Sequence, residues 1–217
     1  MIYFHYGTIV PIYKKGKIMK DLNKKVAVVT GGNSGIGYAS AKKLIENGVN
    51  VIITGRDEER VFKAAEELNA KGIVSDVTDL NAMDKLVEKV KNEYGKIDIL
   101  FVNAGVFEPI PVGSITESIF DSTMDINFKG AVFTTEKFLP ILNNGASIIN
   151  LSSINAYTGM ANTAIYGASK AALNSYTRTA STELAPKKIR VNSINPGPIE
   201  TPLFQKTGMP EEQLNAF

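Results

Sequence analysis

The chain has 217 residues, of which 44% are hydrophobic and 21% charged, a composition typical of one globular domain with a sizeable core. It has no cysteine and a single histidine, His5, so we expect no disulfide, no metal site and no Ser-His-Asp hydrolase. The 24 basic and 22 acidic residues nearly balance, and no long apolar run is present. We therefore expect a cytoplasmic protein without a nucleic-acid or membrane partner.

The first 18 residues read differently from the rest. Pro11 interrupts their apolar stretch, and the basic residues follow that stretch instead of preceding it, unlike a secretory signal. Met19 then opens a stretch that resembles a natural start. We expect residues 1–18 to be a poorly ordered extension and residues 19–217 to form one domain.

From residue 25 onward, short apolar runs alternate with amphipathic segments. The apolar runs predict strands at 26–30, 49–55, 73–77, 97–105, 147–153 and 189–197. The segments between them predict helices at 37–48, 56–72, 80–95 and about 163–185. Apolar strands separated by helices are typical of a parallel sheet covered on both faces. With right-handed crossovers, this pattern predicts a doubly wound α/β fold of the Rossmann type.

A glycine-rich turn, TGGNSGIG at 30–37, joins the first predicted strand to the first helix. Gly31, Gly35 and Gly37 permit a tight turn and the close approach of a ligand. The N–H groups and the dipole of the following helix suit a pyrophosphate. Alone, the turn could be an ordinary loop, but its place after the first strand favours a nucleotide site.

Five short motifs follow one another at characteristic spacing. They are TGGNSGIG, NAG at 103–105, SS at 152–153, YGASK at 166–170 and NPGPIET at 195–201. Together they resemble the short-chain dehydrogenase/reductase family of the simple single-domain type, over about residues 21–205. The family's more usual NNAG begins here with Val102. The resemblance implies an NAD(P)-dependent oxidoreductase that passes a hydride between nicotinamide and a carbonyl or secondary alcohol.

The resemblance also assigns four catalytic roles. Tyr166 would be the general acid/base, Lys170 its activator, Ser153 the anchor of the substrate oxygen, and Asn127 the holder of a relay water. Tyr166 and Lys170 are four positions apart and therefore neighbours on a helix. A tyrosine titrates near pH ~10, and an ammonium ~4 Å away supplies roughly 4 kcal/mol, enough to bring that pKa toward ~7.

A dinucleotide site at the carboxyl ends of the strands is implied in the same way. Its residues would be Gly31, Asn33, Ser34, Gly35, Ile36, Gly37, Arg56, Asp76, Val77, Asn103, Ala104, Gly105, Tyr166, Lys170, Pro196, Gly197, Ile199 and Thr201. Asp76 would contact the adenine, and the NAG motif would line the adenosine ribose. The last four residues of the set would hold the nicotinamide end.

The choice between NADP and NAD depends on the end of the second strand. An acidic residue there would bond the ribose 2′-hydroxyl of NAD, but the position is Gly55, followed by Arg56. A guanidinium suits a 2′-phosphate. Ser34 stands where many NADP-using members carry a basic residue. We expect NADP(H) to be favoured, with NAD(H) possible and no metal.

The substrate and the oligomer are less constrained. The predicted pocket wall, residues 106–114 and 154–163, is mostly apolar with Glu108 as its one charge, which favours an uncharged small-molecule carbonyl or alcohol.

Relatives of the family continue through a further helix and strand, so we expect the sheet to lack that final strand and helix. The alternative is then a dinucleotide-binding module with little turnover. The resemblance implies a homo-oligomer, which we expect to form through helices near 127–143 and 163–185.

Overall fold

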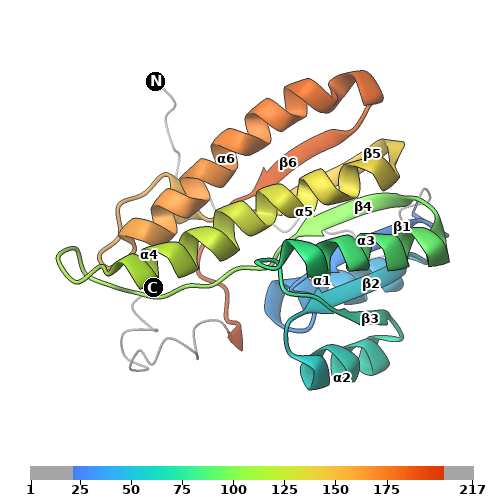
Figure 1. Ribbon diagram of the computed structural model, residues 1–217, viewed down its shortest axis with the longest axis horizontal. Helices are drawn as coiled ribbons and strands as arrows, with labels where there is room; N and C mark the ends of the chain where they lie inside the picture. The colour runs from blue at the N-terminus through green and yellow to red at the C-terminus, as the bar shows by residue number, and fades with distance from the viewer. Residues whose placement is uncertain (1–21, 203–217) are drawn as a thin grey trace, which may run out of the picture.

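The computed structural model describes residues 22–202; the expected extension at 1–18 and the chain beyond residue 202 lie outside this range. Within it, one parallel sheet carries helices on both faces (Figure 1). Its strands are β1 (Val26–Thr30), β2 (Asn50–Gly55), β3 (Lys71–Val74), β4 (Ile97–Val102), β5 (Leu142–Leu151) and β6 (Arg190–Ile194). The spatial order is β3-β2-β1-β4-β5-β6. The predicted doubly wound α/β fold is confirmed.

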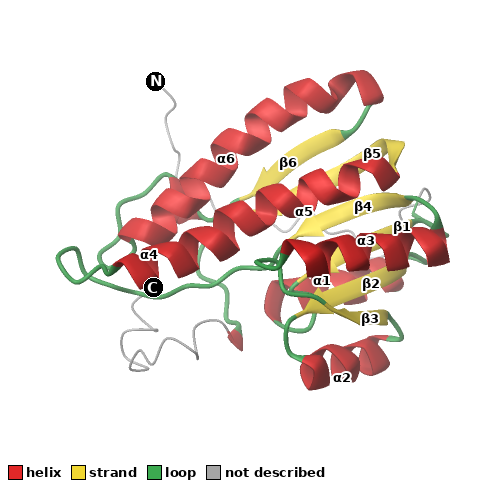
Figure 2. Ribbon diagram, viewed as in Figure 1, coloured by secondary structure: helices red, strands yellow, loops and turns green. Residues whose placement is uncertain are grey.

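Helices alternate with the strands along the chain (Figure 2). They are α1 (Gly35–Ile45), α2 (Glu58–Leu68), α3 (Leu80–Tyr94), α4 (Glu117–Met124), α5 (Gly130–Phe138) and α6 (Ala164–Leu184). A π-helical turn, Asp125–Lys129, joins α4 to α5, and a short 3-10 helix, Ile154–Ala156, follows β5.

Strand β1 explains why the sheet needs cover on both sides. Val28 packs into the cluster that includes Leu86 of α3 and Leu173 of α6, while Ala27 and Val29 face α1 and α2. Each of the three β1 residues is fully buried. Full burial of an aliphatic side chain contributes about 1.5–3 kcal/mol, so the apolar strands favour a sheet with both faces covered.

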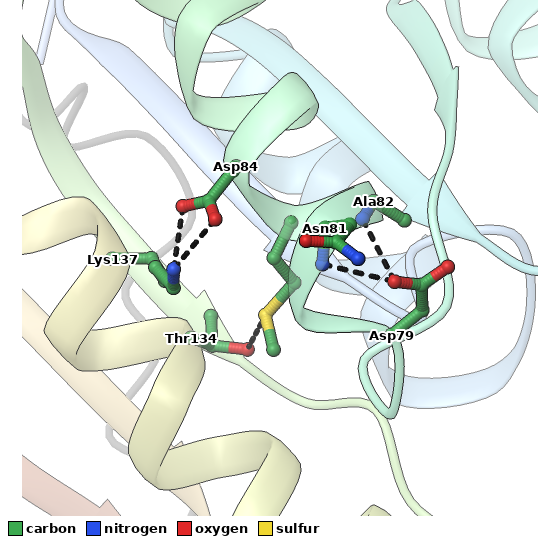
Figure 3. A network of polar contacts seen from close by, with 7 residues as sticks. Asp79, Asn81, Ala82, Asp84, Thr134 and Lys137 are labelled. Atoms are coloured by element: carbon green, nitrogen blue, oxygen red, sulfur yellow. Dashed lines mark hydrogen bonds and ion pairs between the residues drawn. The ribbon is translucent and has the colours of Figure 1, made fainter.

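Polar contacts fasten α3 to α5 on one of these faces. Figure 3 shows the Lys137 ammonium between both carboxylate oxygens of Asp84, at 2.6 and 2.7 Å. Nearby, Thr134 Oγ1 lies 3.6 Å from the sulfur of Met83. Asp79 caps α3 by accepting hydrogen bonds from N–H groups of its first turn. Helices α3 and α5 are thus joined to each other on this face of the sheet.

Asp98 connects strands at the opposite, amino-terminal edge of the sheet. Its carboxylate accepts hydrogen bonds from the Val26 N–H, the Lys25 ammonium and the Asn143 amide, each at 3.0 Å. Burial acts to raise the pKa of Asp98, but these hydrogen bonds outweigh it and hold the pKa below its usual value.

The predicted boundaries were wrong around the third strand. Helix α2 ends at Leu68, not near residue 72, because Asn69 adopts the left-handed conformation at φ 55°. Strand β3 therefore starts at Lys71 and ends at Val74, so that residues 75–77 form the loop after it.

The helix expected near 127–143 is also shorter than predicted. Helix α5 begins at Gly130 and ends at Phe138, and a 3-10 turn with Pro140 follows. Leu142 already starts β5. The π-helical turn before α5 gave no signal in the apolar periodicity.

Candidate active site

A cavity of about 400 Å³ opens at the carboxyl ends of the strands. In the strand order β1 and β4 are neighbours, and the chain leaves them toward opposite sides, which creates a crevice at this edge. All the predicted site residues line the cavity except Gly37 and Asn127. The sequence-predicted residues are therefore brought together from both halves of the sheet.

The glycine turn is shaped for close approach. Gly31 and Gly35 have φ of 63° and 54°, where a side chain would be strained. A Cβ on Gly37 would overlap the Gly31 carbonyl oxygen and lie 2.5 Å from the Asn103 amide nitrogen. Gly37 thus acts from behind the cavity wall, by allowing helix α1 to pack against the turn.

Helix α1 presents its first turn to the cavity. Ser34 occupies the N-cap position, but its side chain makes no capping hydrogen bond. N–H groups left without a side-chain cap at a helix start suit an anion. The turn therefore fits the pyrophosphate of a dinucleotide.

The ends of β2 and β3 form the next part of the wall. Arg56, Arg60 and Asp76 line it, and Asp76 accepts hydrogen bonds from the backbone and the hydroxyl of Thr78. The Ser75 hydroxyl is buried there and has no hydrogen-bond partner among residues 22–202. A buried polar group without a partner is costly, so this wall fits a polar ligand such as an adenosine.

Three of the four predicted catalytic residues, Ser153, Tyr166 and Lys170, line the other end of the cavity. Ser153 follows β5, and Tyr166 and Lys170 project from the first turns of α6. Ser153 forms a hydrogen bond with the Tyr166 side chain. The Lys170 ammonium donates to the Leu151 carbonyl oxygen at 2.8 Å and lies 5.7 Å from the centre of the Tyr166 ring.

Burial controls the titration of both groups on α6. It raises the pKa of Tyr166, and the hydrogen bond from Ser153 offsets only part of this. It lowers the pKa of Lys170 to about 8. The direction for Tyr166 is opposite to the lowering expected from Lys170, because removal from water disfavours the charged form of each group.

Asn127 has a different position from the other predicted residues. It lies in the π-helical turn with 1% of its surface exposed. Its amide oxygen accepts from the Val106 N–H at 2.8 Å, and its amide nitrogen donates to the Val106 carbonyl and to Ser169 Oγ at 2.9 and 3.2 Å. The side chain therefore connects the loop after β4 to α6.

Sequence reasoning missed several residues of the site. Ser75 and Arg60 line the cavity, and Ser169 supports Asn127. Ser75 immediately precedes Asp76, and Arg60 follows Arg56 by four residues, so both carried a positional signal. Ser169 carried none that separates it from other helical serines.

Neither a metal site nor a membrane-spanning helix occurs among residues 22–202. No cluster of three or more histidine, cysteine, aspartate or glutamate residues is arranged to hold a metal ion there. In the same range, no helix combines the length and apolarity needed to cross a bilayer.

Comparison with known proteins is consistent with this geometry. Residues 25–212 match the family described as short chain dehydrogenase. An uncharacterized oxidoreductase of Staphylococcus saprophyticus is 39% identical, over 87% of this chain and 84% of that protein. A short-chain dehydrogenase/reductase structure titled glucose/ribitol dehydrogenase, from Brucella melitensis, is 35% identical with TM-score 0.82, over 87% of this chain and 78% of that one. A 3-ketoacyl-(acyl-carrier-protein) reductase from Brucella melitensis, complexed with NADH, is 33% identical with TM-score 0.81. The match covers 85% of this chain and 80% of that one.

Proposed function

Because the chain belongs to the short-chain dehydrogenase/reductase family, we propose that it transfers a hydride between a nicotinamide dinucleotide and a carbonyl or secondary alcohol. Family membership and relatives named as oxidoreductases support the broad NAD(P)-dependent oxidoreductase class. One observation carries the finer proposal: Ser153, Tyr166 and Lys170 line the same cavity as the glycine turn. A reacting carbon held there would have a proton donor beside it.

The proposed proton chemistry uses these three residues. A bound reduced nicotinamide would supply the hydride to the carbonyl carbon. The Tyr166 phenol would give its proton to the substrate oxygen, which Ser153 would hold by a hydrogen bond. The Lys170 ammonium would stabilise the phenolate that remains; with a pKa of about 8, it is still mainly charged at neutral pH.

Asn127 would act by positioning rather than by direct contact. Both N–H groups of its amide donate, to the Val106 carbonyl and to Ser169 Oγ, and its amide oxygen accepts from the Val106 N–H. It would fix the loop that carries Phe107, whose ring packs edge-on against Tyr166 with centroids 4.8 Å apart. This packing keeps water away from one side of the phenol.

The cofactor we propose is NADP(H) in preference to NAD(H). Arg56 and Arg60 line the cavity at the end of β2, and the position of the acidic NAD-reading residue is Gly55. A guanidinium suits a phosphate ester. The 3-ketoacyl-(acyl-carrier-protein) reductase relative is complexed with NADH, so NAD(H) remains the alternative cofactor, and binding of both dinucleotides should be measured.

The substrate we propose is an uncharged small carbonyl or alcohol. Val106, Phe107, Ile154 and Met160 line the catalytic end of the cavity, and all are apolar. We also propose that copies of the chain associate through the helices near 127–143 and 163–185, with the 44%-exposed Phe120 of the adjoining α4 as a further contact. Exposed aromatic side chains favour protein contacts.

A second candidate is a dinucleotide-binding module with little turnover. The raised pKa of Tyr166 favours it, since a phenol that resists ionisation is a poor base for alcohol oxidation. A screen of carbonyl substrates, followed by the loss of NADPH absorbance, tests both candidates. Turnover that disappears in Tyr166→Phe supports the enzyme. NADPH binding without turnover on any substrate supports the module, and no binding of NADPH or NADH contradicts both.

A further inference from the structure

We propose that Asn33 is a specificity-determining residue, because its side chain occupies the space beside Gly55 that the side chain of an acidic residue at the end of β2 would need. The inference rests on the proposed function, since it concerns how the same site treats two dinucleotides. It concerns a contact between the glycine turn and the end of β2.

Gly55 is a glycine for reasons of space rather than backbone conformation. It ends β2, and its φ does not lie in the left-handed region that favours glycine. A Cβ built on it would lie 2.8 Å from Asn33 Oδ1, 3.2 Å from Asn33 Cγ and 3.0 Å from Val61 Cγ2. Carbon atoms pack at about 3.5–4.0 Å, so any side chain at this position requires a neighbour to move.

The two neighbours differ in how far they can yield. Val61 is fully buried in α2, and its β-branched side chain has one strongly preferred rotamer in a helix. Asn33 is half-buried, and within residues 22–202 no hydrogen bond holds its amide. The steric contact is the same whichever amide atom faces Gly55. Asn33 is therefore the part of the contact that a substitution can relieve.

The cationic side chains around this contact favour an anionic ligand as long as residue 55 carries no carboxylate. Arg56 and Arg60 both line the cavity. Asp57 also lines it, but its carboxylate caps α2 by accepting from the Arg60 N–H at 3.0 Å and pairs with Arg60 Nε at 3.5 Å. Asp76 also lines this wall and accepts hydrogen bonds from the backbone and the hydroxyl of Thr78. A carboxylate added at residue 55 would place a further negative charge next to Arg56.

The Ser75 hydroxyl is an independent sign that a polar ligand group binds here. Its backbone N–H donates to the Gly55 carbonyl oxygen at 2.9 Å, so the two residues are adjacent. The hydroxyl is buried, lines the cavity and lacks a partner among the described residues. Together, Asn33 and Ser75 offer neutral groups that can bond a ribose hydroxyl or a phosphate oxygen.

The test compares the single variants Gly55→Asp, Asn33→Ala and Val61→Ala with the double variants Asn33→Ala/Gly55→Asp and Val61→Ala/Gly55→Asp. Melting temperature is measured without cofactor, and NADPH and NADH dissociation constants are measured by fluorescence titration. We expect Gly55→Asp alone to lower the melting temperature and to weaken the binding of both NADPH and NADH. Asn33→Ala/Gly55→Asp should recover most of the lost melting temperature. It should also shift the preference toward NADH about tenfold to a hundredfold relative to wild type.

Other outcomes overturn the proposal. Additive losses of melting temperature in the Asn33→Ala/Gly55→Asp variant would show that the two residues do not compete for space. Recovery in the Val61→Ala background alone would assign the contact to Val61. A wild-type protein that binds neither dinucleotide would refute the proposed function and the specificity role with it. The melting temperatures, measured without cofactor, would still report whether the two side chains compete.

Discussion

The ammonium nitrogen of Lys170 donates a hydrogen bond to the carbonyl oxygen of Leu151 at 2.8 Å, and Lys170 is only 3% exposed. The contact ties helix α6 to the carboxyl end of β5. It satisfies one of the three donors of the ammonium, and burial lowers the pKa of the group to about 8. The lysine is therefore held in place at a cost to folding.

This cost predicts a pH-dependent stability. The ordinary pKa of lysine is 10.5, so between about pH 8 and 10.5 the unfolded chain binds a proton at Lys170 that the folded protein has lost. Stability of the wild type should therefore rise with pH across this window, relative to Lys170→Met. Below about pH 8 both states are protonated, and the full cost of about 3 kcal/mol applies.

Thermal unfolding at about pH 7.5 and about pH 10 measures the effect. The melting temperature of the wild type minus that of Lys170→Met should increase by about 5 °C from the lower to the higher pH. The reason is that 1 kcal/mol shifts the melting temperature of a domain of this size by about 2–4 °C. Lys63→Met, at an exposed position on α2, is the control and should show no such gain. A constant difference between wild type and Lys170→Met would contradict the burial argument.

Tyr166→Phe should remove turnover and leave cofactor binding almost unchanged. The phenol would carry the transferred proton, whereas the phenylalanine ring keeps the edge-on packing against Phe107. Steady-state rates and NADPH titration measure the two effects. Turnover close to that of the wild type would refute the role of Tyr166. As a control, Tyr157→Phe alters an exposed tyrosine outside the cavity and should leave both measurements unchanged.

Arg56→Ala should weaken NADPH binding more than NADH binding. Arg56 lines the cavity beside Gly55, where the 2′-phosphate of NADP would lie in the proposed complex. A charged hydrogen bond contributes about 1.5–3 kcal/mol, so the expected loss for NADPH is roughly tenfold to a hundredfold. Lys63→Ala removes a cation from the nearby helix without touching the cavity. Equal losses for both dinucleotides would show that Arg56 does not recognise the phosphate.

Gly37→Ala should destabilise the protein and abolish dinucleotide binding. Within a helix, alanine normally improves on glycine by about 1 kcal/mol. Here the added methyl group would overlap the Gly31 carbonyl oxygen and crowd the Asn103 amide. Gly159→Ala is the matched control, because a Cβ there would meet no atom within 4 Å. A melting temperature equal to that of the control would show that the turn can relax.

The sequence predicted those parts of the molecule that depend on local pattern and on the ends of parallel strands. The five motifs lie on separate elements, yet Ser153, Tyr166 and the glycine turn line one cavity, since parallel strands deliver their following loops to the same edge. The strands could be predicted equally well, because both faces of the sheet are buried and β1 is apolar from Val26 to Val29.

The remaining features depend on contacts between distant residues. The partners of Asn127 are 21 and 42 residues away, so its role as a connection between Val106 and Ser169 could not be predicted from spacing. The raised pKa of Tyr166 depends on burial, which the helical pattern does not report. The early end of α2 depends on Asn69 adopting a left-handed conformation that asparagine permits but does not require.

Asp98 gathers Lys25, Val26 and Asn143 at the amino ends of three strands, whereas the cavity lies at the carboxyl ends. A five-residue strand such as β1 spans roughly 17 Å, about two Debye lengths at physiological salt. Charges placed near Asp98 would therefore be screened from a bound dinucleotide. Substitutions at this edge could therefore serve to immobilise the protein on a support, or to raise its working temperature, without changing its cofactor preference.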